Sequence, residues 1–417
     1  MHWLRSRTDL KFYGYIESMN FFKKIFITYL IASAIFLGGM IGVYSLDSPS
    51  IHKNVQEALV ALNDEGPYPA IGNFGGWILD NKTDAIMIRE AANVYSQSPL
   101  QDALLNKCNI DFKPETSTIN LPTENSSADF YVYGRYWHGY MTTLKPLLML
   151  FNYSEIRIIN AFVLLLGLFI SFLGVMKQCT KCISFLYLGV MLVALFPPVF
   201  ISLQYTSCFL LTFIFISILT FFPSLAANKY RGRIYFFVIG MITVFFDFLT
   251  VPIITLCFPL TIYCLMKRDL NCNRNILLLI IFWFLGYGGL WMTKWLLATL
   301  ITGQNFFTDA FHSIFIRTYG EEITLTYSKW IGIAYYVSLF AYTFIIWKSR
   351  RKKPFLYKYF NFLIIALLPA VWLVVLRGHT LHHYWFTYRA FYASFFALII
   401  YIIKIAHARN SNSYTLS

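Results

Sequence analysis

The chain has 417 residues, of which 58% are hydrophobic and only 13% are charged. Soluble domains carry about 25% charged residues, so this composition excludes a soluble globular enzyme and a disordered protein. The net charge is +14 at pH 7. In a membrane protein, the distribution of such an excess of Lys and Arg indicates the orientation of the chain in the membrane. No segment forms a basic domain, so we expect no nucleic-acid partner.

The first apolar segment predicts an uncleaved membrane anchor. Residues 1–24 are polar and end in two lysines, and we place them in the cytosol. Residues 25–46 follow and are long enough to cross ~30 Å of hydrocarbon at about 1.5 Å per residue. No small-residue cleavage site comes after them, so the segment remains attached.

A long polar loop at 47–156 separates this anchor from a predicted nine-helix bundle at 157–405, and residues 406–417 form a short tail. The expected fold is therefore an all-α polytopic membrane protein with about ten transmembrane helices and a large, partly helical first loop. Residues 234–266 are too long for one helix and contain Asp247 and Pro252, so we divide them into a hairpin. The nine expected bundle spans are 157–176, 183–202, 206–225, 234–249, 251–266, 276–299, 330–347, 360–376 and 390–405.

Charge places the termini and the first loop on opposite sides of the membrane. Short segments predicted inside carry 21 basic residues, against 4 in the short segments predicted outside. Both termini are therefore expected in the cytosol. Of the 20 acidic residues, 13 lie in the loop at 47–156, so carboxylate chemistry belongs outside. The bias toward Ile, Phe, Lys, Asn and Tyr is typical of an AT-rich bacterial source, which indicates the inner membrane and a periplasmic loop.

Two helices are predicted in the first loop. Apolar residues at helical spacing form a stripe that ends at Gly66-Pro67, and a second helix begins near Asp80 or Thr83. In that helix Asp80 and Asp84 lie on one face, where one carboxylate can act as a base while the other orients a hydroxyl. Asp80 can equally be an N-cap, with Asp84 in the first turn. Asp47, at the outer end of the first span, is a third candidate. The apolar stripe consists of Ile51, Val55, Ala58, Leu59 and Leu62.

The end of the loop, residues 131–140, combines aromatic rings with two basic side chains. Arg135 can bind phosphate and His138 can donate or accept a proton, while aromatic faces stack on sugar rings. An interfacial aromatic belt is the alternative, but it has less need of Arg and His together. We therefore expect a functional site here, with three rings that hold an acceptor sugar: Tyr133, Tyr136 and Trp137.

Further charged residues are expected at the same outer level. Asp247 and Lys294 lie near the outer ends of their helices, and Arg317 is a candidate for a lipid phosphate. In the last outer segment, Arg377 and His379 favour anion binding over metal, because no acidic residue is nearby. We expect no metal and no cofactor, and the sequence contains no nucleotide-binding or hydrolase motif.

The layout resembles the GT-C class of membrane glycosyltransferases, which use lipid-phosphate sugars outside the membrane. At closer range the chain resembles the serotype-converting O-antigen glucosyltransferases of temperate bacteriophages. The similarity lies in the length, the ten-span layout and three segments: Leu79–Asp84, Tyr133–His138 and Phe246–Thr250. The carboxylate motif that GT-C enzymes carry after the first span is represented by Asp47 alone. Either Asp47 or the pair Asp80 and Asp84 is thus left as the base.

The resemblance implies transfer of glucose from undecaprenyl-phosphate glucose to an O-antigen hydroxyl, which changes the lipopolysaccharide serotype. An outer carboxylate would deprotonate the acceptor, while Arg135, His138 and Lys294 stabilise the leaving phosphate. The donor tail would lie among membrane lipids, and a lipid-linked glucose synthase and a flippase would supply the donor. The alternatives are an O-antigen polymerase and a polyprenyl-linked sugar flippase or transporter, although a transporter needs internal repeats that are not found.

Overall fold

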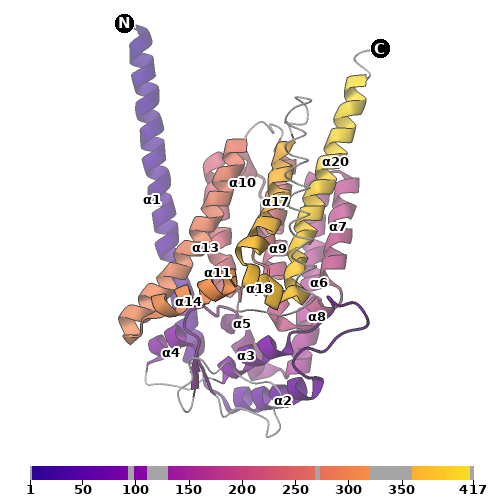
Figure 1. Ribbon diagram of the computed structural model, residues 1–417. Helices are drawn as coiled ribbons and strands as arrows, with labels where there is room; N and C mark the ends of the chain where they lie inside the picture. The colour runs from indigo at the N-terminus through magenta and orange to yellow at the C-terminus, as the bar shows by residue number, and fades with distance from the viewer. Residues whose placement is uncertain (1, 93–97, 110–129, 268–272, 320–358, 414–417) are drawn as a thin grey trace.

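The computed structural model describes residues 2–92, 98–109, 130–267, 273–319 and 359–413. Long helices form a bundle, and the helices of the first loop gather at one end of it (Figure 1). Both ends of the chain lie at the opposite end of the bundle (Figure 1). The first loop is therefore well separated from the two termini.

Five of the described helices are long and apolar enough to span a membrane. They fall in α1 (His2–Tyr44), α6 (Tyr153–Gln178), α9 (Leu203–Phe221), α13 (Asn273–Thr302) and the C-terminal segment Tyr384–His407. Shorter apolar helices complete the bundle, so the chain is a helical membrane protein, but ten spans are not confirmed. The expected span at 330–347 lies outside the described residues. The remaining bundle helices are α7 (Lys181–Leu195), α8 (Pro198–Ile201), α10 (Ser224–Ala227), α11 (Lys229–Phe246), α12 (Ile254–Met266), α17 (Phe360–Val375) and α20 (Phe391–Ser413).

The outward faces of the spans are apolar. On α6 the exposed residues Phe162, Leu166 and Phe169 follow one side of the helix, and Leu164 and Leu168 are buried on the other. Continuous exposed apolar surface of this size marks contact with membrane or protein. The predicted boundary at residue 25 lies inside one continuous helix, whose apolar part begins at Met19.

Helices α11 and α13 approach closely at two glycines. A Cβ atom on Gly240 would lie 2.1 Å from the Trp283 carbonyl oxygen, and one on Gly286 would lie 2.0 Å from that of Phe237. Small residues permit such close approach in membranes, where van der Waals packing drives association. The predicted hairpin is confirmed, because α11 ends before Asp247 and α12 begins at Ile254.

The first loop is folded against the bundle. Its helices are α2 (Pro49–Glu65), α3 (Asn81–Ala91), α4 (Pro99–Leu105) and α5 (Met141–Leu150). All five residues of the predicted stripe on α2 are buried, and the helix ends at Gly66 with a φ of 84°. A short antiparallel pair, β1 (Lys107–Asn109) and β2 (Phe130–Val132), adds a small sheet to the helical fold that was predicted.

Short helices from the second half of the chain lie at the same end as the first loop. They are α14 (Phe306–Tyr319), α18 (Arg377–His382), α19 (Tyr384–Thr387) and the 3-10 helix η1 (Tyr388–Ala390). Figure 1 shows α14 crossing the bundle next to α18. Residues from distant parts of the sequence therefore meet around α3.

Candidate active site around Asp80

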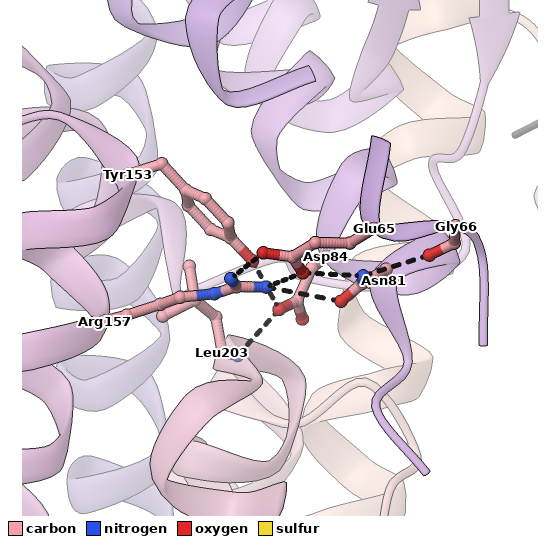
Figure 2. Close-up of polar contacts among 7 residues, drawn as sticks. All are labelled: Glu65, Gly66, Asn81, Asp84, Tyr153, Arg157 and Leu203. Carbon is pink, nitrogen blue, oxygen red and sulfur yellow. Dashed lines mark hydrogen bonds and ion pairs between the residues drawn. The ribbon is translucent and has the colours of Figure 1, made fainter. Parts of the chain in front are cut away.

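Asp84 anchors α3 to the start of α9. One of its carboxylate oxygens accepts hydrogen bonds from the Ser202 hydroxyl and the Gln204 N–H, and the other accepts from the Leu203 N–H and the Tyr153 hydroxyl. The first N–H groups of a helix have no partner within the helix, so Asp84 caps α9 from outside. Burial raises its pKa even though these bonds oppose the shift. Figure 2 shows Asp84 directed at Tyr153 and Leu203.

A second polar group fixes the beginning of α3. Arg157 on α6 donates to both oxygens of Glu65, at 2.5 and 2.8 Å, and the Asn81 side chain donates to Glu65 and to the Gly66 carbonyl oxygen (Figure 2). Burial opposes ionisation of Glu65, but the Arg157 contacts prevail and lower its pKa. The end of α2 and the start of α3 are thus held on α6.

Asp80 occupies the N-cap of α3, as one of the two interpretations predicted. Its Oδ1 accepts from the Thr83 N–H at 3.0 Å, and the side chain has no exposed surface. Its Oδ2 is buried and has no hydrogen-bond partner among the described residues. Burial, with a contribution from Asp84, raises the pKa of Asp80 to about 7. An unpartnered buried carboxylate oxygen costs about 1–3 kcal/mol, and such perturbed acids concentrate at functional sites.

The surroundings of Asp80 come from two ends of the chain. Its charge, with the larger effect of burial, raises the pKa of Tyr68, and Lys82 interacts electrostatically with both Asp80 and His383. Tyr68 packs on Trp385, with ring centroids 5.0 Å apart, and Trp385 lies 5.4 Å from His383 by the same measure. A carboxylate, a lysine, an imidazole and two aromatic rings are therefore linked to one another by these pairwise contacts.

Two histidines and Arg317 extend this cluster. His379 donates from Nε2 to the Leu249 carbonyl oxygen at 2.9 Å. Burial, and then neighbouring positive charge that includes Arg317, lowers the pKa of both His379 and His383 well below the ordinary value. Both imidazoles are consequently neutral near pH 7. Arg317 lies 5.4 Å from the Tyr136 ring, and its Nη1 is buried without a partner in the described part of the chain. An anion would satisfy this guanidinium.

The three rings expected to stack on an acceptor sugar are buried instead. Tyr133 is 6% exposed, Tyr136 3% and Trp137 1%. Tyr136 stacks on Phe248, and Trp137 donates its indole N–H to the Leu290 carbonyl oxygen at 2.8 Å. These rings hold residues 133–138 against the bundle, and the Tyr136 ring packs under the Arg317 guanidinium.

Arg135 is directed away from Asp80 toward α14. Its guanidinium lies 4.4 Å from the Tyr133 ring, and its Nη1 is 3.4 Å from both carboxylate oxygens of Asp309. Its carbonyl oxygen accepts from the indoles of Trp291 and Trp295 on α13. Arg135 thus links the first loop to α13 and α14.

His138 forms a buried cluster with Glu90, which the sequence did not single out. His138 Nδ1 lies 2.9 Å from Glu90 Oε2, and the Tyr140 hydroxyl donates to the same oxygen at 2.5 Å. His138 Nε2 donates to the Tyr133 carbonyl oxygen at 2.8 Å. His138 also has a φ of 54°, a left-handed conformation that this cluster stabilises.

The remaining predicted residues lie elsewhere. Lys294 is buried and donates to the Ala103 carbonyl oxygen and to Asn106 Oδ1. Asp247 accepts from the Cys208 thiol and the Thr250 N–H, and its Oδ2 is buried without a partner in the described segments. Arg377 is exposed at the first residue of α18. The Asp47 side chain is 61% exposed and lies 2.9 Å from His52.

An apolar groove of about 470 Å³ lies beside the segment that leads to Asp80. It is lined by Phe74, Trp77, Leu192, Val193, Phe196, Phe200 and Tyr392. Between this groove and Asp80 the backbone is fixed at two carbonyl oxygens, because Arg389 donates to Gly76 at 3.3 Å and the Tyr205 hydroxyl donates to Ile78 at 3.0 Å. The groove and the buried carboxylate are thus joined by a few well-held residues.

Electrostatic interactions connect three predicted residues, Asp80, His379 and Arg317, through Lys82 and His383. The sequence did not identify Lys82, His383 or Tyr68 as site residues. Comparison with protein-family models, characterised proteins and solved structures found no match to this chain. Its function is therefore inferred from the chemistry of this region.

Proposed function

We propose that this protein is a membrane glycosyltransferase, which transfers a glucosyl residue from undecaprenyl-phosphate glucose to a hydroxyl of an O-antigen sugar and so modifies lipopolysaccharide. The observation that carries the proposal is the buried Asp80 carboxylate, whose Oδ2 has no hydrogen-bond partner among the described residues and which interacts electrostatically with Lys82 and Tyr68. A carboxylate with a pKa of about 7 is a stronger base than an ordinary one and is still partly ionised at neutral pH.

In the proposed reaction, the acceptor oxygen forms a bond to C1 of the glucose while the bond from C1 to the phosphate oxygen breaks. The hydroxyl proton passes to Asp80, and the electron pair of the broken bond remains on undecaprenyl phosphate. Arg317 and Lys82 would stabilise the charge that develops on this phosphate. The unpartnered Nη1 of Arg317 supports this role, because a phosphate oxygen would complete its hydrogen bonds.

The apolar groove supports a lipid-linked donor. Its lining is almost entirely aliphatic and aromatic, and it includes Trp77, three residues before Asp80. A polyprenyl tail could lie there with its phosphate near the site. The segregation of the first loop from both chain ends (Figure 1) supports action on the periplasmic side of a bacterial inner membrane with cytosolic termini. A synthase and a flippase would deliver the donor.

An O-antigen polymerase or a sugar-lipid flippase is the alternative. Asp80, whose Oδ2 has no partner among the described residues, caps α3, and α3 lies at the end of the bundle that carries the first loop (Figure 1). This position favours chemistry at one membrane face over passage through the bilayer.

The test is transfer by purified protein from undecaprenyl-phosphate glucose to O-antigen acceptor. Asp80→Asn keeps an N-cap of equal quality but cannot accept a proton, so transfer should fall about 10²–10⁴-fold while the protein stays folded. Asp47→Asn is the control, because that side chain is exposed and lies 2.9 Å from His52. Equal activity of Asp80→Asn and wild type, or no transfer by wild type to its native acceptor, would reject the proposal.

A further inference from the structure

Tyr68 lies directly opposite Asp80 on a rigid segment. It stands between two prolines, and the carbonyl oxygens of these prolines bond across to the Asp80 segment: Pro67 accepts from the Lys82 N–H at 3.2 Å, and Pro69 from the Leu79 N–H at 3.0 Å. These two bonds bracket Asp80. Proline fixes φ, so the backbone on both sides of Tyr68 is restrained.

Trp385 completes an aromatic pair with Tyr68. The two rings are 5.0 Å apart and inclined by 59°, and Tyr68 is 37% exposed. The Trp385 carbonyl oxygen accepts from Arg389 at 2.7 Å, which holds α19 in place. The indole Nε1 of Trp385, however, is buried and has no acceptor among the residues that the structure describes. An indole N–H can only donate, so a ligand oxygen would remove the cost of this unmet bond.

We propose that Tyr68 and Trp385 form a carbohydrate-binding platform next to Asp80, and that it holds the acceptor glycan of the proposed glycosyltransferase, on which this inference rests. Aromatic faces bind the apolar face of a sugar ring, a free indole N–H can donate to a hydroxyl or ring oxygen, and the Asp80 carboxylate can accept from a hydroxyl. These three features coincide here. The buried rings at 133, 136 and 137 already pack against protein and cannot provide such a surface.

The polarity of the surroundings favours a sugar over a lipid chain. The His383 ring lies 5.4 Å from Trp385, and Lys82 interacts electrostatically with His383; both are polar groups that a hydrocarbon chain would have to desolvate. The apolar alternative is the groove at Phe74 and Trp77, which is built from different side chains. The platform and the groove therefore divide two chemically distinct substrates between them.

The experiment measures binding of lipid-free O-antigen polysaccharide, released from the lipopolysaccharide of the source strain, by calorimetry without any donor. Full-length protein is used in nanodiscs. Tyr68→Ala and Trp385→Ala should each weaken binding about tenfold, and Trp385→Phe, which keeps a ring but loses the N–H, about threefold. Phe311→Ala is the matched control, because it removes an exposed ring on α14 and should leave binding unchanged.

Transfer assays on the same preparations separate the two proposals. The platform is supported if Tyr68→Ala and Trp385→Ala raise the KM for glycan with little change in kcat. Wild-type transfer together with unchanged binding and KM in correctly folded Ala variants would overturn the platform and leave the glycosyltransferase intact. Absence of both binding and transfer in wild type would overturn both.

Discussion

Two carboxylates one helical turn apart have opposite environments. The two oxygens of Asp84 accept hydrogen bonds from four donors. In Asp80, Oδ1 accepts from the Thr83 N–H, and Oδ2 has no partner within the described chain. Each hydrogen bond that an acid accepts stabilises its ionised form and lowers its basicity. Asp84 is thus suited to a structural role, and Asp80 retains the capacity to take a proton.

The raised pKa of Asp80 predicts how pH affects both rate and stability. The rate should fall about tenfold per unit below pH 7, as the carboxylate that accepts the proton is lost. In the unfolded chain the pKa is lower, so the folded state loses stability as pH rises from about 4 through 7. Asp80→Asn does not have this pH-dependent loss. The melting temperature of the variant minus that of wild type should therefore be larger at pH 8 than at pH 5. Parallel melting curves that keep the same offset at both pH values would contradict the assignment.

Replacing one hydrogen-bond-accepting oxygen of Asp84 should destabilise the junction between α3 and α9. Asp84→Asn leaves two donors facing an amide group, at a cost of about 3 kcal/mol, and thermal unfolding should shift accordingly. Tyr153→Phe removes one of the four bonds and should cost about 1 kcal/mol. A fully stable Asp84→Asn protein without transfer activity would instead place Asp84 in the chemistry.

At the level of elements, local sequence signals predicted several features. The α2 stripe repeats at helical spacing and ends at a glycine, the start of α3 carries a capping side chain, and Pro252 marks the break between α11 and α12. All of these signals act within about ten residues. The meeting of Tyr68 with Trp385 spans more than 300 positions, and no periodicity in the sequence encodes such a contact. For the same reason the sequence did not identify His383 as a site residue.

The contact between α11 and α13 can be tested with two glycines on one helix. Gly286→Ala forces a Cβ atom onto the Phe237 carbonyl oxygen, and it should destabilise the protein by about 3 kcal/mol. Gly288→Ala is the control, because no described atom lies within 4 Å of its Cβ position and alanine favours a helix. Thermal unfolding of both variants measures the difference, and equal melting temperatures would refute the packing.

At the scale of the whole molecule, lipid-facing spans, an apolar groove and a polar site occur in succession. The predicted site residues were expected at one end of the bundle, but the fold divides them. Arg135 joins α13 and α14, and His138 and Lys294 lie in buried bonds. Arg317 lies over the Tyr136 ring and interacts electrostatically with His379. Their sequence positions indicated a common membrane level. Which of them share one site depends on packing that composition does not specify.

Filling the groove should affect the donor and not the acceptor. Val193→Trp places a large ring among the groove residues, so KM for undecaprenyl-phosphate glucose should rise several-fold, with a smaller effect on a donor of short chain length. Leu166→Trp adds the same ring to an exposed position on α6 and should behave as wild type. Transfer rates against donor concentration distinguish them, and identical kinetics would show that the tail lies elsewhere.

The cap that Asp84 provides also bears on biogenesis. The Leu203 N–H that it binds belongs to a residue synthesised 119 positions later, so the ribosome completes the first loop well before its partner helix exists. During that interval the Asp84 carboxylate lacks the hydrogen-bond donors that residues 202–204 later provide. The loop can reach its final structure only after α9 has entered the bilayer, and a soluble fragment spanning 47–156 should remain unfolded when it is made alone.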